Sequence, residues 1–223
     1  MPYQNENESK MKMNAEQLEL PNIINPRLED WKLKIFYDDC CDNPREWCNI
    51  GEILCFPNRY LKSELPLSDS YDEKFRYSRS FKEIEDMLDK LGYIHERICV
   101  YDHSGVRVYL GSPCCQWDSG YVGWYCVSRE RIREEYGVKR VSKNLLKKVR
   151  EVMESEINTY SNWLEGNVFG FELYKNGELI DSCSGFIADY MDEAIKDMIE
   201  HLTPEFTNSF SEQEILNMTE KSW

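Results

Sequence analysis

The segment FGFELYKNGELIDSCSGF, residues 169–186, decides the fold class. Apolar side chains alternate with other residues over 169–173, which is typical of a strand with one buried face. Asn176-Gly177 follows, and this pair favours a two-residue turn because both residues accept positive φ angles. Residues 179–186 supply the returning strand. We therefore predict a β-hairpin in this segment.

The same signals recur along the chain. Residues 97–101 and 106–110 flank the turn Asp102-His103-Ser104-Gly105 and predict a second hairpin. Alternation and apolar runs indicate further strands at 31–37, 50–56 and 122–127. Apolar stripes at helical spacing predict helices over 81–91, 129–136, 143–164 and 191–202, and a terminal helix from Ser211. Strands and helices mix without a regular βαβ rhythm, which predicts an α+β fold with a mainly antiparallel sheet, built from β-hairpins with packed helices.

Local signals also predict how the chain is divided. Residues 1–28 are polar and are interpreted as an N-terminal extension. Residues 29–188 form the predicted α+β core domain, and 189–223 a predicted acidic C-terminal helical segment. Within the core, Ser80 with Glu83 predicts a capping box, and the polar stretch 62–77 is interpreted as a linker.

Composition and charge exclude several function classes. No window approaches the roughly 18 uninterrupted apolar residues of a membrane span, and no secretory signal pattern begins the chain. With 41 acidic and 27 basic residues among 223, the net charge of −14 disfavours bulk binding to nucleic acid or anionic lipid. Nine cysteines, an odd number, argue against a disulfide framework, so we predict a reducing cytoplasm.

The charge is unevenly distributed. Residues 129–150 carry nine basic and three acidic residues, whereas 151–223 carry three basic and 16 acidic residues. Such a pattern is typical either of a solvated helix beside an acidic surface or of a bipolar surface that meets one charged partner. For the second case, the predicted partner-binding residues are Asp189, Asp192, Glu193, Asp197 and Glu200.

The basic segment offers an alternative. Residues 132–138, followed by Ser142 and a basic helix, are similar to the turn of a helix-turn-helix motif. In that interpretation, a nucleic-acid-binding module would place basic side chains near phosphates or base edges. These side chains are Lys143, Lys147, Lys148 and Arg150.

Aromatic residues gather in a nearby turn. Trp117 and Trp124 bracket Asp118 and two glycines, a composition found in stacking platforms and partner hot spots. The other interpretation is a turn with core aromatic residues packed behind it. We include Trp117, Asp118 and Trp124 among the candidate partner-binding residues.

Signals for catalysis and cofactors are weak. Cys40, Cys41, Cys48 and Cys55 lack the paired spacing of zinc knuckles, so we predict no metal, and no phosphate-binding loop or other cofactor motif occurs. His103 is the best candidate for a catalytic base and would need Asp118 or a cysteine across the sheet. An enzyme acting on a nucleotide or a defence protein is therefore an alternative, and we favour a protein without enzymatic activity.

Three motifs carry a resemblance to a known family. Pro44-Arg45-Glu46-Trp47, Tyr101-Asp102-His103-Ser104-Gly105 and WDSGYVGW (117–124) are similar to segments of uncharacterised proteins carried by phages, plasmids and other mobile elements of low-GC bacteria. Members of that family tend to have Asp at position 48, which implies that the cysteines are not a shared ligand set. The resemblance supplies no activity. It implies an accessory gene, many of which blunt host defence.

These observations combine into one expectation. We predict a phage or mobile-element protein, of the anti-CRISPR or antirestriction type, that binds and inhibits a host defence complex in the bacterial cytoplasm. Its partner would be a defence protein or ribonucleoprotein and not a membrane. Acidic mimicry of nucleic acid is the predicted means, because negative charge in a basic groove competes through the same electrostatics.

Overall fold

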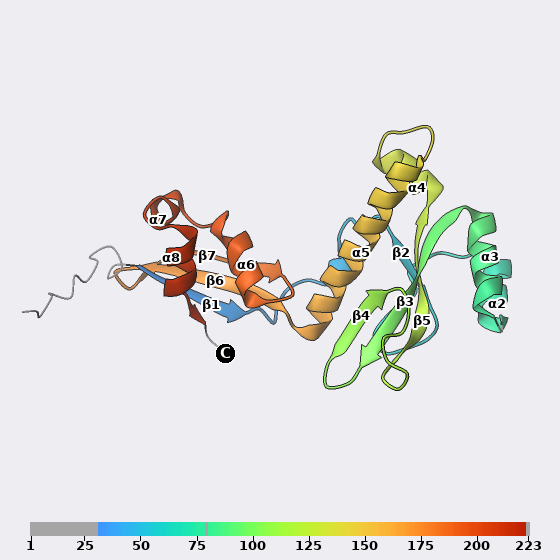
Figure 1. Cartoon of the computed structure of the whole chain (residues 1–223), viewed down its shortest axis with the longest axis horizontal. Helices are drawn as coiled ribbons and strands as arrows, with labels where there is room; N and C mark the ends of the chain where they lie inside the picture. Colours follow the sequence, from blue (N-terminus) through green and yellow to red (C-terminus); the bar gives the residue numbers. More distant parts are fainter. Residues whose placement is uncertain (1–30, 79, 222–223) are drawn as a thin grey trace, which may run out of the picture.

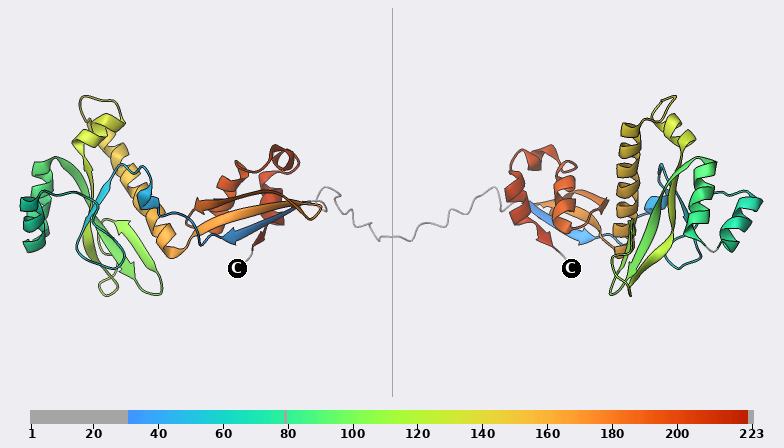
Figure 2. Two further views of the ribbon diagram at one scale, coloured as in Figure 1. Left: turned by 180° about the vertical axis from the view of Figure 1, so that it is seen from behind. Right: turned by 45° about the vertical axis from the view of Figure 1, so that its right-hand side comes forward.

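Two four-stranded sheets, each with its own hydrophobic core, form the two lobes of the molecule. The computed structural model describes residues 31–78 and 80–221. Sheet A has the strand order β7-β6-β1-β8 and sheet B the order β2-β5-β3-β4. The lobes lie at opposite ends of an elongated molecule, and the long helix α5 stands between them (Figures 1 and 2). The predicted α+β fold is confirmed, with its strands divided between two sheets.

Sheet A joins segments that are far apart in the sequence. Strand β1 (Trp31–Tyr37) pairs along its whole length with β6 (Val168–Lys175), and β6 pairs with β7 (Glu178–Ile187). The short β8 (Glu220–Lys221) runs parallel to β1. The predicted hairpin is confirmed, since Asn176 and Gly177 at its turn have φ angles of 53° and 82°.

Helices of the C-terminal segment cover sheet A. They are α6 (Met191–Ile199), α7 (Pro204–Thr207) and α8 (Glu212–Met218), the last with a complete capping box between Ser211 and Glu214. Their buried side chains pack in one cluster with those of β1 and β6. Helices α6 to α8 of the predicted C-terminal segment therefore share a core with strands of the predicted 29–188 domain.

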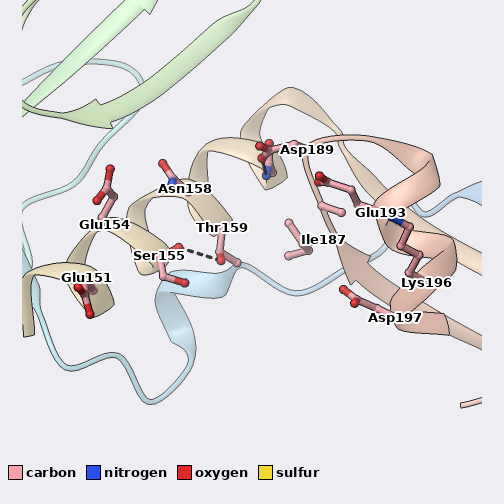
Figure 3. Close-up of a pocket in the computed structure, with 12 residues that line it drawn as sticks. Glu151, Glu154, Ser155, Asn158, Thr159, Ile187, Asp189, Glu193, Lys196 and Asp197 are labelled. Carbon is pink, nitrogen blue, oxygen red and sulfur yellow. Dashed lines mark hydrogen bonds between the residues drawn. The ribbon is translucent and has the colours of Figure 1, made fainter. Parts of the chain in front are cut away.

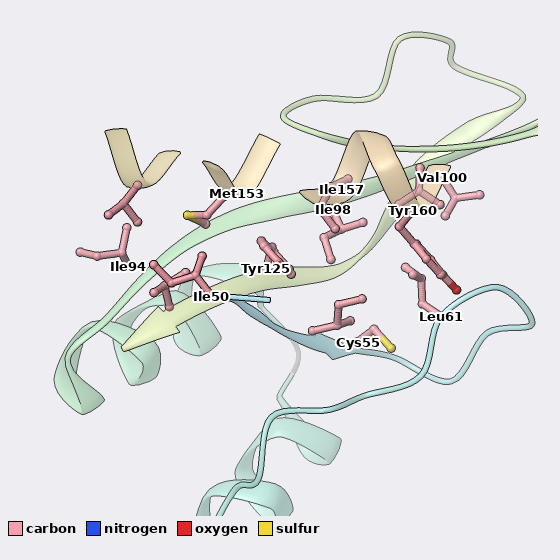
Figure 4. Packing of buried hydrophobic residues seen from close by; sticks show 14 of the residues in the cluster. Ile50, Cys55, Leu61, Ile94, Ile98, Val100, Tyr125, Met153, Ile157 and Tyr160 are labelled. Carbon is pink, nitrogen blue, oxygen red and sulfur yellow. The ribbon is translucent and has the colours of Figure 1, made fainter. Parts of the chain in front are cut away.

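Sheet B is covered on both faces. Its strands are β2 (Glu52–Cys55), β3 (Tyr93–Asp102), β4 (Val106–Leu110) and β5 (Ser119–Ser128), all antiparallel. Helices α4 (Arg129–Glu135) and α5 (Lys143–Glu165) cover one face, where the apolar stripe of α5 that includes Met153 and Ile157 meets the sheet (Figure 4). Helices α2 (Asp69–Tyr77) and α3 (Phe81–Leu91) cover the other.

Two local predictions are wrong, and the prediction of an N-terminal extension is not tested. The predicted linker 62–77 contains helix α2, which buries Phe75 against the core of sheet B. The side chain of Ser80 makes no capping hydrogen bond, and the Glu83 carboxylate accepts from the Ser78 hydroxyl at 2.7 Å. The extension predicted for 1–28 lies outside the described residues. Among the helices that the structure describes, none has both the length and the apolar character of a membrane span.

Candidate interaction site

The five acidic residues predicted to bind a partner form one exposed surface, which we call the acidic face. Asp189 lies just before α6, and the other four lie on α6 or at its C-terminal end. The opposite side of the helix buries Met191, Ala194, Ile195 and Met198 against sheet A. The amphipathic pattern that anchors the helix therefore places Asp192, Glu193 and Asp197 on its exposed side. Asp189 and Glu200, at the two ends of the helix, are also exposed.

A groove runs between this surface and helix α5, and we call it the inter-lobe groove. It has a volume of about 690 Å³. One wall comes from α5 in the sheet B lobe, and the other from residues 187–197 in the sheet A lobe (Figure 3). The lining residues are Glu151, Glu154, Ser155, Asn158, Thr159, Asn162, Ile187, Ala188, Asp189, Glu193, Lys196 and Asp197.

Carboxylates occur on both walls of the inter-lobe groove. Asp189, Glu193 and Asp197 of the acidic face lie opposite Glu151 and Glu154 of α5, with the ammonium of Lys196 among them (Figure 3). Like charges on facing walls repel one another. A cation between the walls would be attracted from both sides.

The deep end of the groove joins the lobes. The amide of Asn162, only 9% exposed, donates to the Asp189 carboxylate at 2.6 Å. A smaller hollow of about 220 Å³ continues from there and shares Asn158, Asn162 and Asp189 with the inter-lobe groove. A second tie between the lobes is the hydrogen bond from the Trp163 indole to the Cys41 carbonyl, at 3.0 Å.

Sequence reasoning missed the α5 half of this site. Glu151, Glu154 and Asn158 follow the polar stripe of the predicted helix, which was interpreted only through its basic first half. The change from basic to acidic residues at 151 was a visible signal. That α5 faces α6 depends on the packing of the two lobes, which no local pattern encodes.

The two tryptophans do not form one surface. Trp117 is 87% exposed in the loop before β5. Trp124 is 1% exposed and packs against the rings of Phe56, Phe75 and Phe81. Trp124 is therefore a core residue that no partner reaches, and its inclusion among the partner-binding candidates is wrong. Trp117 and Asp118 lie on the sheet B lobe, where they belong to a different surface from the acidic face.

The residues considered for catalysis meet at the tip of sheet B. His103 Nδ1 lies 3.7 Å from one Asp118 oxygen, and Cys115 Sγ lies 3.6 Å from the other. The carboxylate thus stands between the imidazole and the thiol. His103 therefore has near it the carboxylate that the catalytic prediction required. The Cys115 thiol contacts that carboxylate and not the imidazole, whereas a nucleophile is activated by direct contact with its base.

The basic residues of α5 lie at its N-terminal end. Lys143 and Lys148 are exposed, as predicted for a nucleic-acid-binding helix. Lys147 pairs with Glu151 at 3.6 Å, and Arg150 pairs with Glu96 of β3 at 2.7 Å. Two of the four candidate contacts are therefore already directed to carboxylates. The helix also packs lengthwise on sheet B through Val149 and the residues that follow it, unlike a recognition helix that projects into a groove.

The cysteines are all free thiols in very different surroundings. Of the four in residues 40–55, Cys40 and Cys48 are exposed, Cys41 is partly exposed and Cys55 is buried. Within residues 31–78 and 80–221, no three His, Cys, Asp or Glu side chains are grouped in a way that would hold a metal ion.

These surroundings predict a graded reactivity of the thiols. Burial raises the pKa of Cys55 and of Cys99 to about 11, and it also raises the pKa of Cys126. A hydrogen bond from the Tyr109 hydroxyl lowers the pKa of the exposed Cys114. Because the thiolate is the reactive form, brief alkylation near about pH 8 should label Cys114 fastest and leave the three buried thiols unlabelled. Peptide mass spectrometry measures this, and labelling of Cys55 or Cys126 as fast as that of Cys40 would contradict the burial described here.

Comparison with known proteins adds no relative. No family model, curated protein or solved structure matches the chain. The resemblance to proteins of mobile elements stays a prediction from the three motifs.

Proposed function

We propose that this protein works by binding another macromolecule through the acidic face and the inter-lobe groove. One observation carries the proposal. Five carboxylates, from two lobes, surround a single groove in a chain whose net charge is −14. A surface of this kind attracts basic partners over a distance and repels nucleic acid and anionic lipid.

The chemistry of the partner follows from this charge. Proteins hold nucleic acid in grooves lined with lysine and arginine, which neutralise phosphates. An acidic protein seated in such a groove competes with nucleic acid for the same side chains. If the predicted resemblance to mobile-element proteins holds, the partner that this protein inhibits is a host defence complex, such as a CRISPR effector or a restriction enzyme.

Neutralising the acidic face should abolish capture of that partner. The variant replaces the five carboxylates by amides, as Asp189→Asn, Asp192→Asn, Glu193→Gln, Asp197→Asn and Glu200→Gln. A matched control neutralises five exposed carboxylates elsewhere, at Asp69, Glu73, Glu130, Glu134 and Glu178. In affinity capture from the carrier cell, we expect the wild type and the control to enrich the same basic partner and the acidic-face variant to lose it. Equal capture by all three would show that the acidic face is not the binding surface.

The basic end of α5 supports a second candidate, a nucleic-acid-binding module. Nine exposed basic residues lie in 129–150, although Lys147 and Arg150 are ion-paired. This candidate predicts a gel shift that weakens steeply with salt and is lost when Lys147, Lys148 and Arg150 become alanine. We expect instead no shift even at about 50 mM salt, because the whole chain repels phosphates. A shift that these substitutions remove would favour the module over the proposal above.

A further inference from the structure

We infer that the inter-lobe groove is a docking site for one extended, arginine- or lysine-bearing segment of a protein partner. The inference rests on the proposed function and names the occupant of the same site. It states that the segment binds within the groove. General attraction of basic molecules to an acidic chain would not require this position.

The dimensions of the groove fit an extended peptide. From Glu151 to Asn162, the α5 wall is about 16 Å long at the helical rise per residue, which is the length of roughly five residues of extended chain. The volume of about 690 Å³ lies within the range of roughly 300–1,000 Å³ that is typical of ligand sites. The smaller hollow at Tyr190 extends the same path.

The lining fits the chemistry of such a segment. Carboxylates on both walls can each accept hydrogen bonds from a guanidinium or an ammonium group. On the α5 wall, Ser155 and Asn158 offer a hydroxyl and an amide of the kind that pair with a peptide backbone. The Thr159 hydroxyl donates to the Ser155 carbonyl at 3.0 Å and can still accept. The apolar contribution is small, from Ile187 and Ala188, so an apolar helix would find little surface to bury. Figure 3 shows Ser155, Asn158 and Thr159 on the α5 wall and Ile187 on the facing wall.

The two walls belong to different lobes, and this adds selectivity. Glu151 and Glu154 are fixed to sheet B through α5, whereas Glu193 and Asp197 are fixed to sheet A through α6. A basic segment in the groove can contact carboxylates on both sides at once. A flat acidic surface would offer carboxylates on one side only, so the groove should bind the segment more tightly.

The test uses the full chain and a fluorescein-labelled peptide of alternating arginine and serine, with binding followed by fluorescence anisotropy. The groove variant combines Glu154→Lys with Glu193→Lys, one residue from each wall. The matched control combines Glu73→Lys with Glu178→Lys, which are exposed, one in each lobe, and change the net charge equally. An uncharged block, Ser155→Trp, fills the groove without altering the charge. Far-UV circular dichroism confirms that each variant is folded.

We expect the groove variant and the Ser155→Trp block each to weaken peptide binding at least about tenfold, and the matched control no more than about twofold. If the groove variant and the control lose the same amount of peptide affinity, the binding reflects only the net charge of the chain, and the docking site is overturned. A peptide of alternating glutamate and serine that binds as well would also overturn it. A competition experiment gives a third contradicting result. Excess groove-variant protein, without a label, is added to the wild type with the labelled peptide bound. If it displaces the peptide, the occupant of the groove is a second copy of the chain and the inference is overturned.

One outcome separates this inference from the proposed function, and a second would overturn both. If Asp192→Lys with Glu200→Lys, on the acidic face outside the groove lining, abolishes binding while the groove variants do not, the acidic face stands and the groove fails. If the wild type binds no peptide at about 50 mM salt, both fail.

Discussion

Replacing Arg45 with alanine should lower the free energy of unfolding by about 3 kcal/mol. The Arg45 side chain is 6% exposed and holds the start of sheet B together. It donates two hydrogen bonds to the Glu64 carboxylate, at 3.0 and 2.7 Å, one to the Tyr125 hydroxyl and one to the Gly51 carbonyl. We expect the lower end of the range for a broken buried pair because Glu64, at 28% exposure, keeps some contact with water.

The loss should spread beyond the pair. The Tyr125 hydroxyl donates in turn to Glu156 at 2.5 Å, and Glu156 also accepts from the Ile50 amide at 2.7 Å. Burial raises the pKa of Tyr125, so this hydroxyl stays protonated as a donor. The guanidinium therefore anchors a chain of contacts that runs from the 44–47 motif through β5 to α5.

Arg59 supplies the comparison for this experiment. It pairs with Asp102 at 2.6 Å but is 74% exposed. Exposed pairs contribute little to stability, so Arg59→Ala should leave the denaturation curve almost unchanged. Guanidinium denaturation followed by far-UV circular dichroism measures both variants. Equal effects at Arg45 and Arg59 would mean that the network around Tyr125 is not what stabilises this lobe.

Gly123→Ala should destabilise the protein by about 3 kcal/mol, the second large effect. A Cβ atom at Gly123 would lie 2.3 Å from the Leu54 carbonyl oxygen and 2.7 Å from the Cys55 Cα. Both are backbone atoms of β2, which pairs with β5 at this position. Because the backbone cannot move aside as a flexible side chain does, β2 must separate from β5. The core around Trp124 would open with it.

Gly120 lies in the same strand and provides the matched control. A Cβ atom there meets nothing within 4 Å, and the residue is exposed. Gly120→Ala should therefore be neutral or should stabilise by about 0.5 kcal/mol, because alanine restricts the unfolded chain more than glycine does. Thermal unfolding of the two variants, measured side by side, tests the close approach of β2. A Gly123→Ala protein as stable as the control would contradict it.

Local patterns predicted most elements, because turns and amphipathic stripes are encoded within a few residues. Asn176-Gly177 indicated its hairpin, and Ser142 indicated the start of α5. The division into two sheets was not predictable in this way. Strand β1 pairs with β6, more than a hundred residues later in the chain, and alternation shows that a strand has a buried face but not which strand lies beside it. Helix α2 was missed because only Phe75 of its residues is buried.

The candidate site likewise has one part that local patterns predicted and one part that they could not predict. The exposed carboxylates of α6 could be predicted, since the helical period places them opposite Met191 and Ile195. Glu151 and Glu154 could not be assigned to the same site, because their position depends on how α5 packs between the lobes. Trp124 was misassigned because the sequence gives the same glycine-rich context to an exposed platform and to a core residue. Gly123 explains that context, since the glycine is required by the approach of β2.

The central question is where on the chain the basic peptide binds. An amide NMR titration of the isotope-labelled full chain with the arginine–serine peptide answers it residue by residue. We predict that the largest shift changes fall in 151–162 and 187–200, on the two walls of the inter-lobe groove. Changes confined to the loop around Trp117 or to the basic segment 129–150 would contradict a protein that works through its acidic groove.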